Sequence, residues 1–287
     1  MSFLSKIEHC NRRDMRRFVP FTVAGTQVGW LTAERKELLL TYKTVFQPVA
    51  DEGKAGVALH KRLTTPAARS KAIAEIAPEL VKTPLFLKQR RELYAVRNHW
   101  SDKPLFNLDR GLVPGFGVRA YGVHVNGVVH KPSGLHLWIG TRALDMKVEP
   151  GKLDNMVAGG QPAGLGLMDN LVKECGEEAH IKPKLARTAK PASMITYAFQ
   201  CPEGLRADTL FCYDLDMPAT PKLKPSEETH HYELMPLDKV LKTVKTTSRF
   251  KFNVNLVIID FAIRNGVIAP ENEPDFERIV AWLHERA

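Results

Sequence analysis

The sequence predicts an α/β fold of the α+β type, because two groups of strand-like runs lie on either side of one central helix. Between residues 111 and 160, and again between residues 192 and 236, β-branched and aromatic residues recur in short runs. One segment with helical spacing, at about residues 167–179, separates the two groups. Apolar segments with helical spacing follow residue 250. Strands that flank a helix and are followed by helices are typical of a layered α/β sandwich.

The N-terminal third of the chain carries mixed signals. The first residues, MSFLSKIEHCNRRDMRRF, are basic but lack the apolar core of a secretory signal, so we expect an ordinary first helix. Residues 18–31 are predicted to form a strand pair that turns at Gly25. Residues 66–82 are predicted to form a helix, with Pro66 at its first position. We expect Pro78 to break this helix or to end it early.

The remaining elements follow in order along the chain. The predicted strands are residues 117–129, 134–144, 153–160, 192–199, 207–217 and 230–236. Helices are predicted at residues 167–179, 253–266 and 273–287. A proline-rich loop, MPATPKLKP, separates the last two strands. The change in character near residue 112 predicts a smaller N-terminal domain, residues 1–112, and a larger domain, residues 113–287.

The composition limits the class of protein. With 287 residues, 44% of them hydrophobic and 25% charged, the chain is long enough for one large or two small globular domains. No apolar run reaches the roughly 18 residues that a membrane helix needs, so no membrane partner is expected. The four cysteines lack CxxC spacing. The absence of this spacing argues against a zinc site or a disulfide framework and indicates free thiols in a cytoplasmic protein.

The net charge of +9 allows several kinds of partner. The lysine and arginine residues are dispersed, and the sequence has neither an RNA-binding aromatic motif nor zinc-finger spacing. An anionic small molecule is therefore favoured over nucleic acid as the partner.

Three glutamates lie close together in GGQPAGLGLMDNLVKECGEEAHI, residues 159–181. Because residues three and four apart share one face of a helix, Glu174, Glu177 and Glu178 project together. Like charges this close repel unless they are exposed or neutralised. Mg²⁺ would neutralise them, since it prefers oxygen ligands and bridges to substrate phosphates. The glutamates alone are more typical of a solvated acidic face.

A glycine-rich loop before the helix favours a metal site over a solvated acidic face, since glycine allows close approach of the backbone to a ligand. Its glycines are Gly159, Gly160, Gly164 and Gly166. A P-loop is excluded, because Leu165 and Gly166 stand where Lys and Ser or Thr are required. A dinucleotide-binding loop is excluded, because Asp169 occupies the third glycine position.

The loop and helix together resemble the Nudix box. Its pattern is Gly, five residues, Glu, seven residues, Arg-Glu, an aliphatic residue, any residue, Glu-Glu, any residue, Gly and an aliphatic residue. Anchored on Glu177-Glu178, this chain supplies Gly159, Glu174, Cys175 and Ile181. It departs from the pattern at Leu165 for Glu, Lys173 for Arg and His180 for Gly. In the family the first Glu and the Arg brace the loop against the helix. The metal-binding glutamates are intact.

The resemblance covers most of the chain and is specific from about residue 115 to 270. LRADTLFCYDLDMP, HYELMPLDKV and FKFNVNLVIIDFAIRNGVI are similar to a narrower Nudix branch that carries an extra N-terminal domain. The resemblance implies a Nudix α/β/α sandwich with a mixed sheet plus a smaller N-terminal α+β domain. It also implies hydrolysis of thiamine diphosphate, or of its oxidised forms, to the monophosphate. We expect the N-terminal domain to select the organic half of the substrate.

The same resemblance assigns roles to single residues. The implied ligands of Mg²⁺, or of Mn²⁺ in its place, are Glu174, Glu177, Glu178, the carbonyl of Gly159 and Glu228. Glu174 is also a candidate base for the attacking water. The assignment of Glu228 is open, because Glu227 precedes it. For substrate binding, Arg142 is a candidate on the phosphate and Trp138 is a candidate for stacking on a ring, although a core position is common for such a Trp.

Two other functions remain open on the sequence. One is a Nudix hydrolase of nucleoside diphosphate derivatives such as ADP-ribose. The other is a non-catalytic Nudix-fold binding protein, which the intact glutamates disfavour because a binding module has no need of three repelling carboxylates. The sequence also leaves open whether the chain is a monomer or a homodimer.

Overall fold

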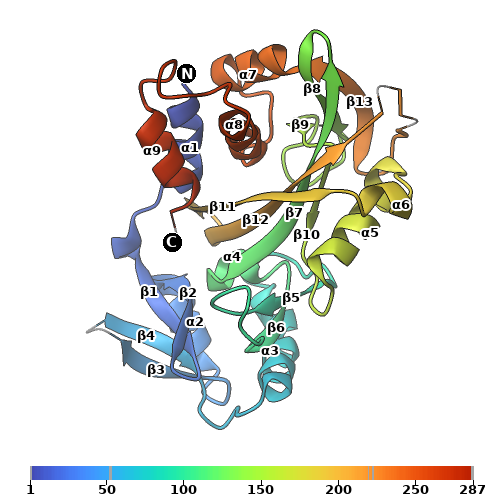
Figure 1. The fold of residues 1–287 in the computed structure, drawn as a ribbon. Coiled ribbons are helices and arrows are strands. Elements are labelled where there is room, and N and C mark those ends of the chain that lie inside the picture. The colour runs from blue at the N-terminus through green and yellow to red at the C-terminus, as the bar shows by residue number, and fades with distance from the viewer. Residues whose placement is uncertain (1, 52–53, 219, 222, 286–287) are drawn as a thin grey trace.

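The computed structural model describes residues 2–51, 54–218, 220–221 and 223–285. Within these residues the strands form three sheets, of four, seven and two strands. The four-stranded sheet belongs to the N-terminal part of the chain, and the seven-stranded sheet forms the centre of the larger part (Figure 1).

The N-terminal sheet has the strand order β2-β1-β4-β3. Its strands are β1 (Phe18–Val23), β2 (Thr26–Thr32), β3 (Phe46–Asp51) and β4 (Lys54–Leu59). Between β1 and β2, Ala24 and Gly25 have φ angles of 50° and 79°. Positive φ at both central residues is what a two-residue type I′ hairpin turn requires. The predicted strand pair at Gly25 is confirmed.

Helices and a small hairpin complete the N-terminal part. They are η1 (Met15–Arg17), α2 (Ala33–Thr41), α3 (Pro66–Leu80), β5 (Leu93–Val96), β6 (Phe106–Asp109) and α4 (Val113–Phe116). The core beneath them holds mutually contacting rings, those of Phe21, Phe46, Phe106 and Phe116. Helix α3 begins at Pro66 as predicted but continues through Pro78, so the expected early break is wrong. Pro78 lies in the last turn, where it disturbs little of the helix that precedes it.

The central sheet is mixed. Its strand order is β11-β12-β7-β8-β13, and two short strands pair beside β7 and β8. The strands are β7 (Arg119–Lys131), β8 (Gly134–Arg142), β9 (Leu153–Asp154), β10 (Val157–Gly160), β11 (Lys190–Cys201), β12 (Gly204–Asp216) and β13 (Thr229–Pro236). Strands β7 and β12 are parallel, whereas the other pairings are antiparallel.

One predicted strand, residues 153–160, is divided in the structure into β9 and β10. The Asp154 carboxylate accepts a hydrogen bond from the backbone N–H of Asn155, 2.9 Å away. Such a local side-chain bond competes with strand pairing and favours a turn. The break therefore comes from the Asp-Asn pair.

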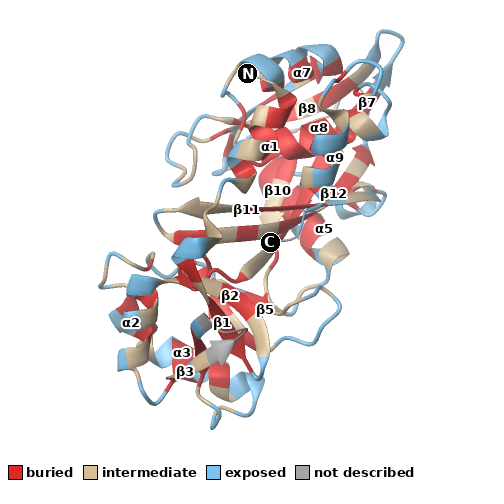
Figure 2. Cartoon of the chain, turned by 90° about the vertical axis from the view of Figure 1, so that its left-hand side faces the viewer, coloured by how far each residue is buried: buried red, intermediate tan, exposed pale blue. Residues whose placement is uncertain are grey.

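Helices cover both faces of the central sheet (Figure 1). Helix α5 (Leu167–Ala179) and the short α6 (Pro183–Ala186) lie on one face, in a core with Val123, Val157 and Tyr213. The other face carries α7 (Leu237–Thr246), α8 (Val254–Arg264) and α9 (Phe276–Leu283). Helix α8 is buried over most of its length (Figure 2). This arrangement confirms the predicted α/β/α sandwich with a mixed sheet.

The first helix, α1 (Phe3–Asn11), packs with the C-terminal helices rather than with the N-terminal sheet. Its Phe3 and Ile7 are buried in the same core as α8 and α9. Lys6 donates a hydrogen bond to the carbonyl of Thr247, at the end of α7. A helix at the N-terminus is confirmed. The division at residue 112 stays a prediction, and α1 packs across it.

The four cysteines are free thiols, as predicted. Over the described ranges, the helices are too short or too polar for any of them to span a membrane.

Candidate active site

Helix α5 divides its three glutamates between the interior and the surface. Glu174 and Glu178 are buried, with 9% and 8% of their surface exposed. The side chain of Glu177 is 60% exposed. Residues 174 and 178 are four apart and lie one turn above the other, which explains why they share the buried face. The structure therefore brings Glu174 and Glu178 together and leaves Glu177 at the surface.

Helix α5 ends at His180, in the left-handed conformation with φ 55° and ψ 30°. This is the position where the Nudix box has glycine. A left-handed residue commonly ends a helix, and glycine adopts this conformation without the strain that a Cβ introduces. His180 keeps the turn in spite of its side chain.

Lys173 binds the glutamates of its own helix. Its Nζ lies 2.7 Å from Oε2 of Glu177 and 3.2 Å from Oε1 of Glu174. The lysine thus places a positive charge between the exposed and the buried carboxylate.

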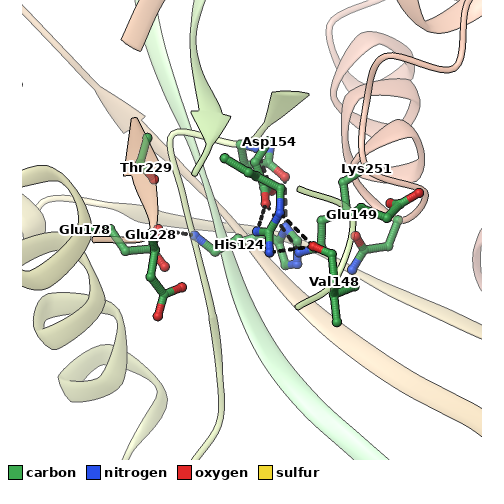
Figure 3. Close-up of polar contacts among 12 residues, drawn as sticks. His124, Val148, Glu149, Asp154, Glu178, Glu228, Thr229 and Lys251 are labelled. Atoms are coloured by element: carbon green, nitrogen blue, oxygen red, sulfur yellow. Dashed lines mark hydrogen bonds and ion pairs between the residues drawn. The ribbon is translucent and has the colours of Figure 1, made fainter. Parts of the chain in front are cut away.

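The buried carboxylates are electrostatically coupled. Burial raises the pKa of Glu178 well above its ordinary value, and the charges of Asp154 and Glu174 raise it further. Burial also raises the pKa of Glu174, although Lys173 lowers it. The charge of Glu228 contributes to raising both. Figure 3 shows Glu178 and Glu228 on one side of the polar network around Asp154.

These interactions bear on the choice between the two neighbouring acids. The charge of Glu228 helps to raise the pKa of both buried glutamates. Glu228 stays the predicted additional acid, and the alternative of Glu227 stays open.

Gly159, the next-to-last residue of β10, is required sterically. A Cβ added to Gly159 would overlap the carboxyl carbon of Glu174. One residue earlier, the backbone N–H of Ala158 donates a hydrogen bond to Oε2 of Glu178, at 3.1 Å. Both buried glutamates therefore contact the strand that leads into the loop.

Two residues that sequence reasoning missed fasten the loop to the helix. The Nδ2 of Asn170 donates to the carbonyl of Gly160 at 2.8 Å and to Oε1 of Gln161 at 3.1 Å. The Nε2 of Gln161 donates to the carbonyl of Leu165 at 2.7 Å. Asn170 and Gln161 are both buried. They brace the loop where Leu165 and Lys173 replace the Glu and Arg of the box. In the sequence, the only sign of this brace was an asparagine, Asn170, inside the apolar run of the predicted helix.

The donor chemistry fits a hard divalent cation. In the parts of the chain that the structure describes, no three acidic, histidine or cysteine side chains are gathered closely enough to hold a metal ion as they stand. The buried oxygens of Glu174 and Glu178 are nevertheless like charges that need a cation. The backbone of Gly159 lies against one of them, and the charge of Glu228 raises the pKa of both. These four residues would hold the ion, with Glu177 on its solvent side.

Arg142 is engaged in a buried ion pair. Only 8% of the residue is exposed, and its Nη1 donates to Oδ2 of Asp154 at 2.7 Å. Its Nε and Nη2 donate to the carbonyl of Val148 at 3.2 and 3.0 Å. Burying Asp154 requires a partner of opposite charge, and Lys251 is a second one at 3.4 Å. These contacts do not support the predicted role of Arg142 on a substrate phosphate.

Trp138 packs against the core beneath α5. Its indole Nε1 has no hydrogen-bond partner among the described residues. The expected stacking on a substrate ring stays a prediction, and this packing favours the core position.

A sequence family, two plant proteins and a solved structure are similar to this chain. Residues 2–120 match a family described as a domain of unknown function, DUF4743. Nudix hydrolase 20, chloroplastic, of Arabidopsis thaliana is 36% identical over 94% of this chain and 74% of its own. Nudix hydrolase 24, chloroplastic, of the same plant is 35% identical, with the same coverage. The crystal structure of DR0079 from Deinococcus radiodurans is 18% identical, covers 59% of this chain and 98% of that chain, and has a TM-score of 0.43.

The plant relatives correct one expectation and establish the family. Both are chloroplastic by name, so the cytoplasmic location predicted from the sequence is wrong. Free cysteines indicate a reducing compartment, and the cytoplasm is only one such compartment. Because the identity to both plant enzymes extends over nearly the whole chain, the protein belongs to the Nudix hydrolase family and is an enzyme that cleaves diphosphate linkages.

Proposed function

We propose that this Nudix hydrolase uses Mg²⁺, or Mn²⁺ in its place, to convert thiamine diphosphate or an oxidised analogue of it to the monophosphate and phosphate. The metal-dependent chemistry is carried by one observation, the buried and mutually repelling pair Glu174 and Glu178 beside Gly159. The thiamine part is supported by the sequence resemblance between residues 115 and 270. The metal ligands would be Glu174, Glu178, Glu228 and the Gly159 carbonyl.

The residues of the site have separate roles in the hydrolysis. A divalent cation, when bound, neutralises the charge of the diphosphate and of the glutamates. Water attacks one phosphorus, the P–O bond to the bridging oxygen breaks, and the products are the monophosphate and phosphate. Glu174 accepts the proton from the water, a role that suits a carboxylate whose pKa is raised by burial. The N–H of Ala158 holds Glu178 in place.

A substrate screen tests this function. Purified protein is incubated with Mg²⁺ and with thiamine diphosphate, oxidised thiamine diphosphate, ADP-ribose or a sugar nucleotide, and phosphate or monophosphate release is measured. We expect kcat/KM to be highest for a thiamine-type diphosphate. The Glu178→Gln variant serves as the inactive control. Higher kcat/KM for ADP-ribose would refute the thiamine assignment, and turnover by Glu178→Gln at the wild-type rate would refute the metal site.

A further inference from the structure

The hairpin β5–β6 of the N-terminal part reaches the loop of the active site. The N–H of Ala163, in the loop between β10 and α5, donates to the carbonyl of Leu93 at 2.7 Å. The next residue, Tyr94, places its hydroxyl against Gly160, where an added Cβ would collide with it. The β5–β6 hairpin of the N-terminal part therefore lies directly beside Gly160, at the start of the loop between β10 and α5.

The Tyr94 hydroxyl makes no hydrogen bond to the described parts of the chain, although most of the residue is buried. The residue is 6% exposed. None of the hydrogen bonds within the described parts of the chain involves this hydroxyl. A hydroxyl that the protein leaves unpaired beside the site is available to donate to a ligand. Burial raises the pKa of Tyr94 by more than the charge of Arg110 lowers it, so the hydroxyl keeps its proton and can donate.

Arg110 stands beside Tyr94, directly after β6. Its Cζ lies 5.7 Å from the centre of the Tyr94 ring, and its Nη1 lies 2.8 Å from Oε2 of Glu92. The side chain is 51% exposed. The other two guanidinium nitrogens have no side-chain partner in the described ranges. Burial lowers the pKa of Arg110, but the nearby Tyr94, Glu92 and Glu228 outweigh this and raise it.

The charge of Arg110 is close enough to the site to be affected by one of its acids. Glu228 raises the pKa of Arg110, and it also raises the pKa of Glu174 and of Glu178. Arg142, the other arginine considered for a phosphate, is buried in its pair with Asp154. A guanidinium with unused donors matches the oxygens of a phosphate group, which it can bind with two parallel hydrogen bonds.

We propose that Arg110 and Tyr94 form a phosphate-binding site for the diphosphate of the substrate. Arg110 binds non-bridging oxygens of one phosphate, and the Tyr94 hydroxyl donates to an oxygen that faces Gly160. Glu92 holds the guanidinium in place. The proposal rests on the proposed diphosphate hydrolysis. It explains how the N-terminal part takes part in the reaction, because this part supplies the positive charge and α5 supplies the negative charge.

The test uses methylenediphosphonate, a diphosphate analogue that is not hydrolysed, and calorimetric titration of the full-length protein in Mg²⁺. We expect Arg110→Ala to weaken binding by about tenfold or more, because a charge-assisted hydrogen bond is lost. Arg110→Lys should lose less, and Tyr94→Phe should weaken binding by roughly threefold to tenfold. The matched control is Arg90→Ala, which removes an equally charged and exposed residue before β5 and should leave binding unchanged.

The melting temperature separates binding from folding. Tyr94→Phe should not lower it, since the hydroxyl has no partner within the described chain, whereas a structural hydroxyl would lower it. Equal binding by wild type, Arg110→Ala and Tyr94→Phe would overturn the proposed site while leaving the hydrolase intact. If the wild type bound no diphosphonate in Mg²⁺, the proposed function itself would be refuted, and this inference with it.

Discussion

Replacing Glu178 with glutamine should stabilise the metal-free protein while it removes activity. Glu178 is 8% exposed, and burial and neighbouring carboxylates raise its pKa well above the ordinary 4.5. An acid with a raised pKa in the folded state binds its proton more tightly there than in the unfolded chain. Its contribution to stability is therefore full below the unfolded pKa and is lost as the pH rises through the folded pKa. Glutamine is neutral and avoids this loss.

The magnitude follows from two opposing terms. Each unit by which folding raises the pKa costs about 1.4 kcal/mol of stability once the carboxylate is ionised. Glutamine weakens the 3.1 Å hydrogen bond from Ala158 by about 0.5–1 kcal/mol, because the acceptor is no longer charged. Because Glu178 is almost fully buried, the first term outweighs the second, and we expect a net gain. Stabilising single substitutions are typically worth about 0.5–2 kcal/mol, which raises Tm by about 1–4 °C at this chain length.

The assay is thermal unfolding in EDTA at pH 8 and at pH 5, and at pH 8 with saturating Mg²⁺. The gain of Glu178→Gln should be present at pH 8 and shrink toward pH 5, where wild-type Glu178 takes up its proton. With Mg²⁺ the order should reverse, because a ligand at a hundred times its Kd stabilises the wild type by about 2.7 kcal/mol. Glu177→Gln is the control, since its 60% exposed side chain makes a surface ion pair worth at most about 1 kcal/mol. A Glu178→Gln protein that melts below the wild type in EDTA at pH 8, or a difference that is equal at both pH values, would refute the reasoning.

Four further predictions follow from the same contacts. Excess EDTA should abolish phosphate release, and Glu178→Gln should lower kcat at least about a hundredfold in steady-state assays; full turnover in EDTA would contradict the metal mechanism. Gly159→Ala should lower kcat strongly and Tm only slightly, because the added Cβ displaces the Glu174 carboxylate. An unchanged kcat would place Glu174 outside the reaction. His180→Gly should raise the free energy of unfolding by about 0.5–1 kcal/mol in denaturant titrations, because the left-handed residue at φ 55° loses its strain; a decrease would mean that the side chain matters more. Deleting residues 1–110 should yield an unstable protein, as measured by solubility and thermal unfolding. The deletion removes Phe3 and Ile7 from the sandwich core, where a single large-to-small substitution costs about 2–5 kcal/mol of stability. A soluble, folded truncation would show that α1 is dispensable.

The parts of the structure that follow from local pattern were predictable. Helix α5, with its glutamates, and the strands of the central sheet have the expected type and place. Apolar periodicity and turn residues act within a few positions of each other, so a single sequence contains them. The boundaries at residues 153–160 were less predictable, because the Asp154–Asn155 bond that breaks the strand is a side-chain contact rather than a matter of periodicity.

The parts that depend on distant residues were not predictable. The burial of Arg142 is set by Asp154 and Lys251, and the loop brace needs Gln161 and Asn170 to meet after the chain turns. The packing of α1 joins residues more than two hundred positions apart, as the bond from Lys6 to Thr247 illustrates. Periodicity shows which face of a helix is apolar, but not which element will cover it.

The two parts of the chain are coupled through the loop after β10. On one side this loop is held by the pairing of β10 with β7 and by Asn170 of α5. On the other side it is held by the bond from Ala163 to Leu93 and by the contact of Tyr94 with Gly160. The position of Gly159 against Glu174 therefore depends on contacts from both parts. A change in the β5–β6 hairpin should alter metal affinity as well as substrate binding, because both act through the same few residues of backbone.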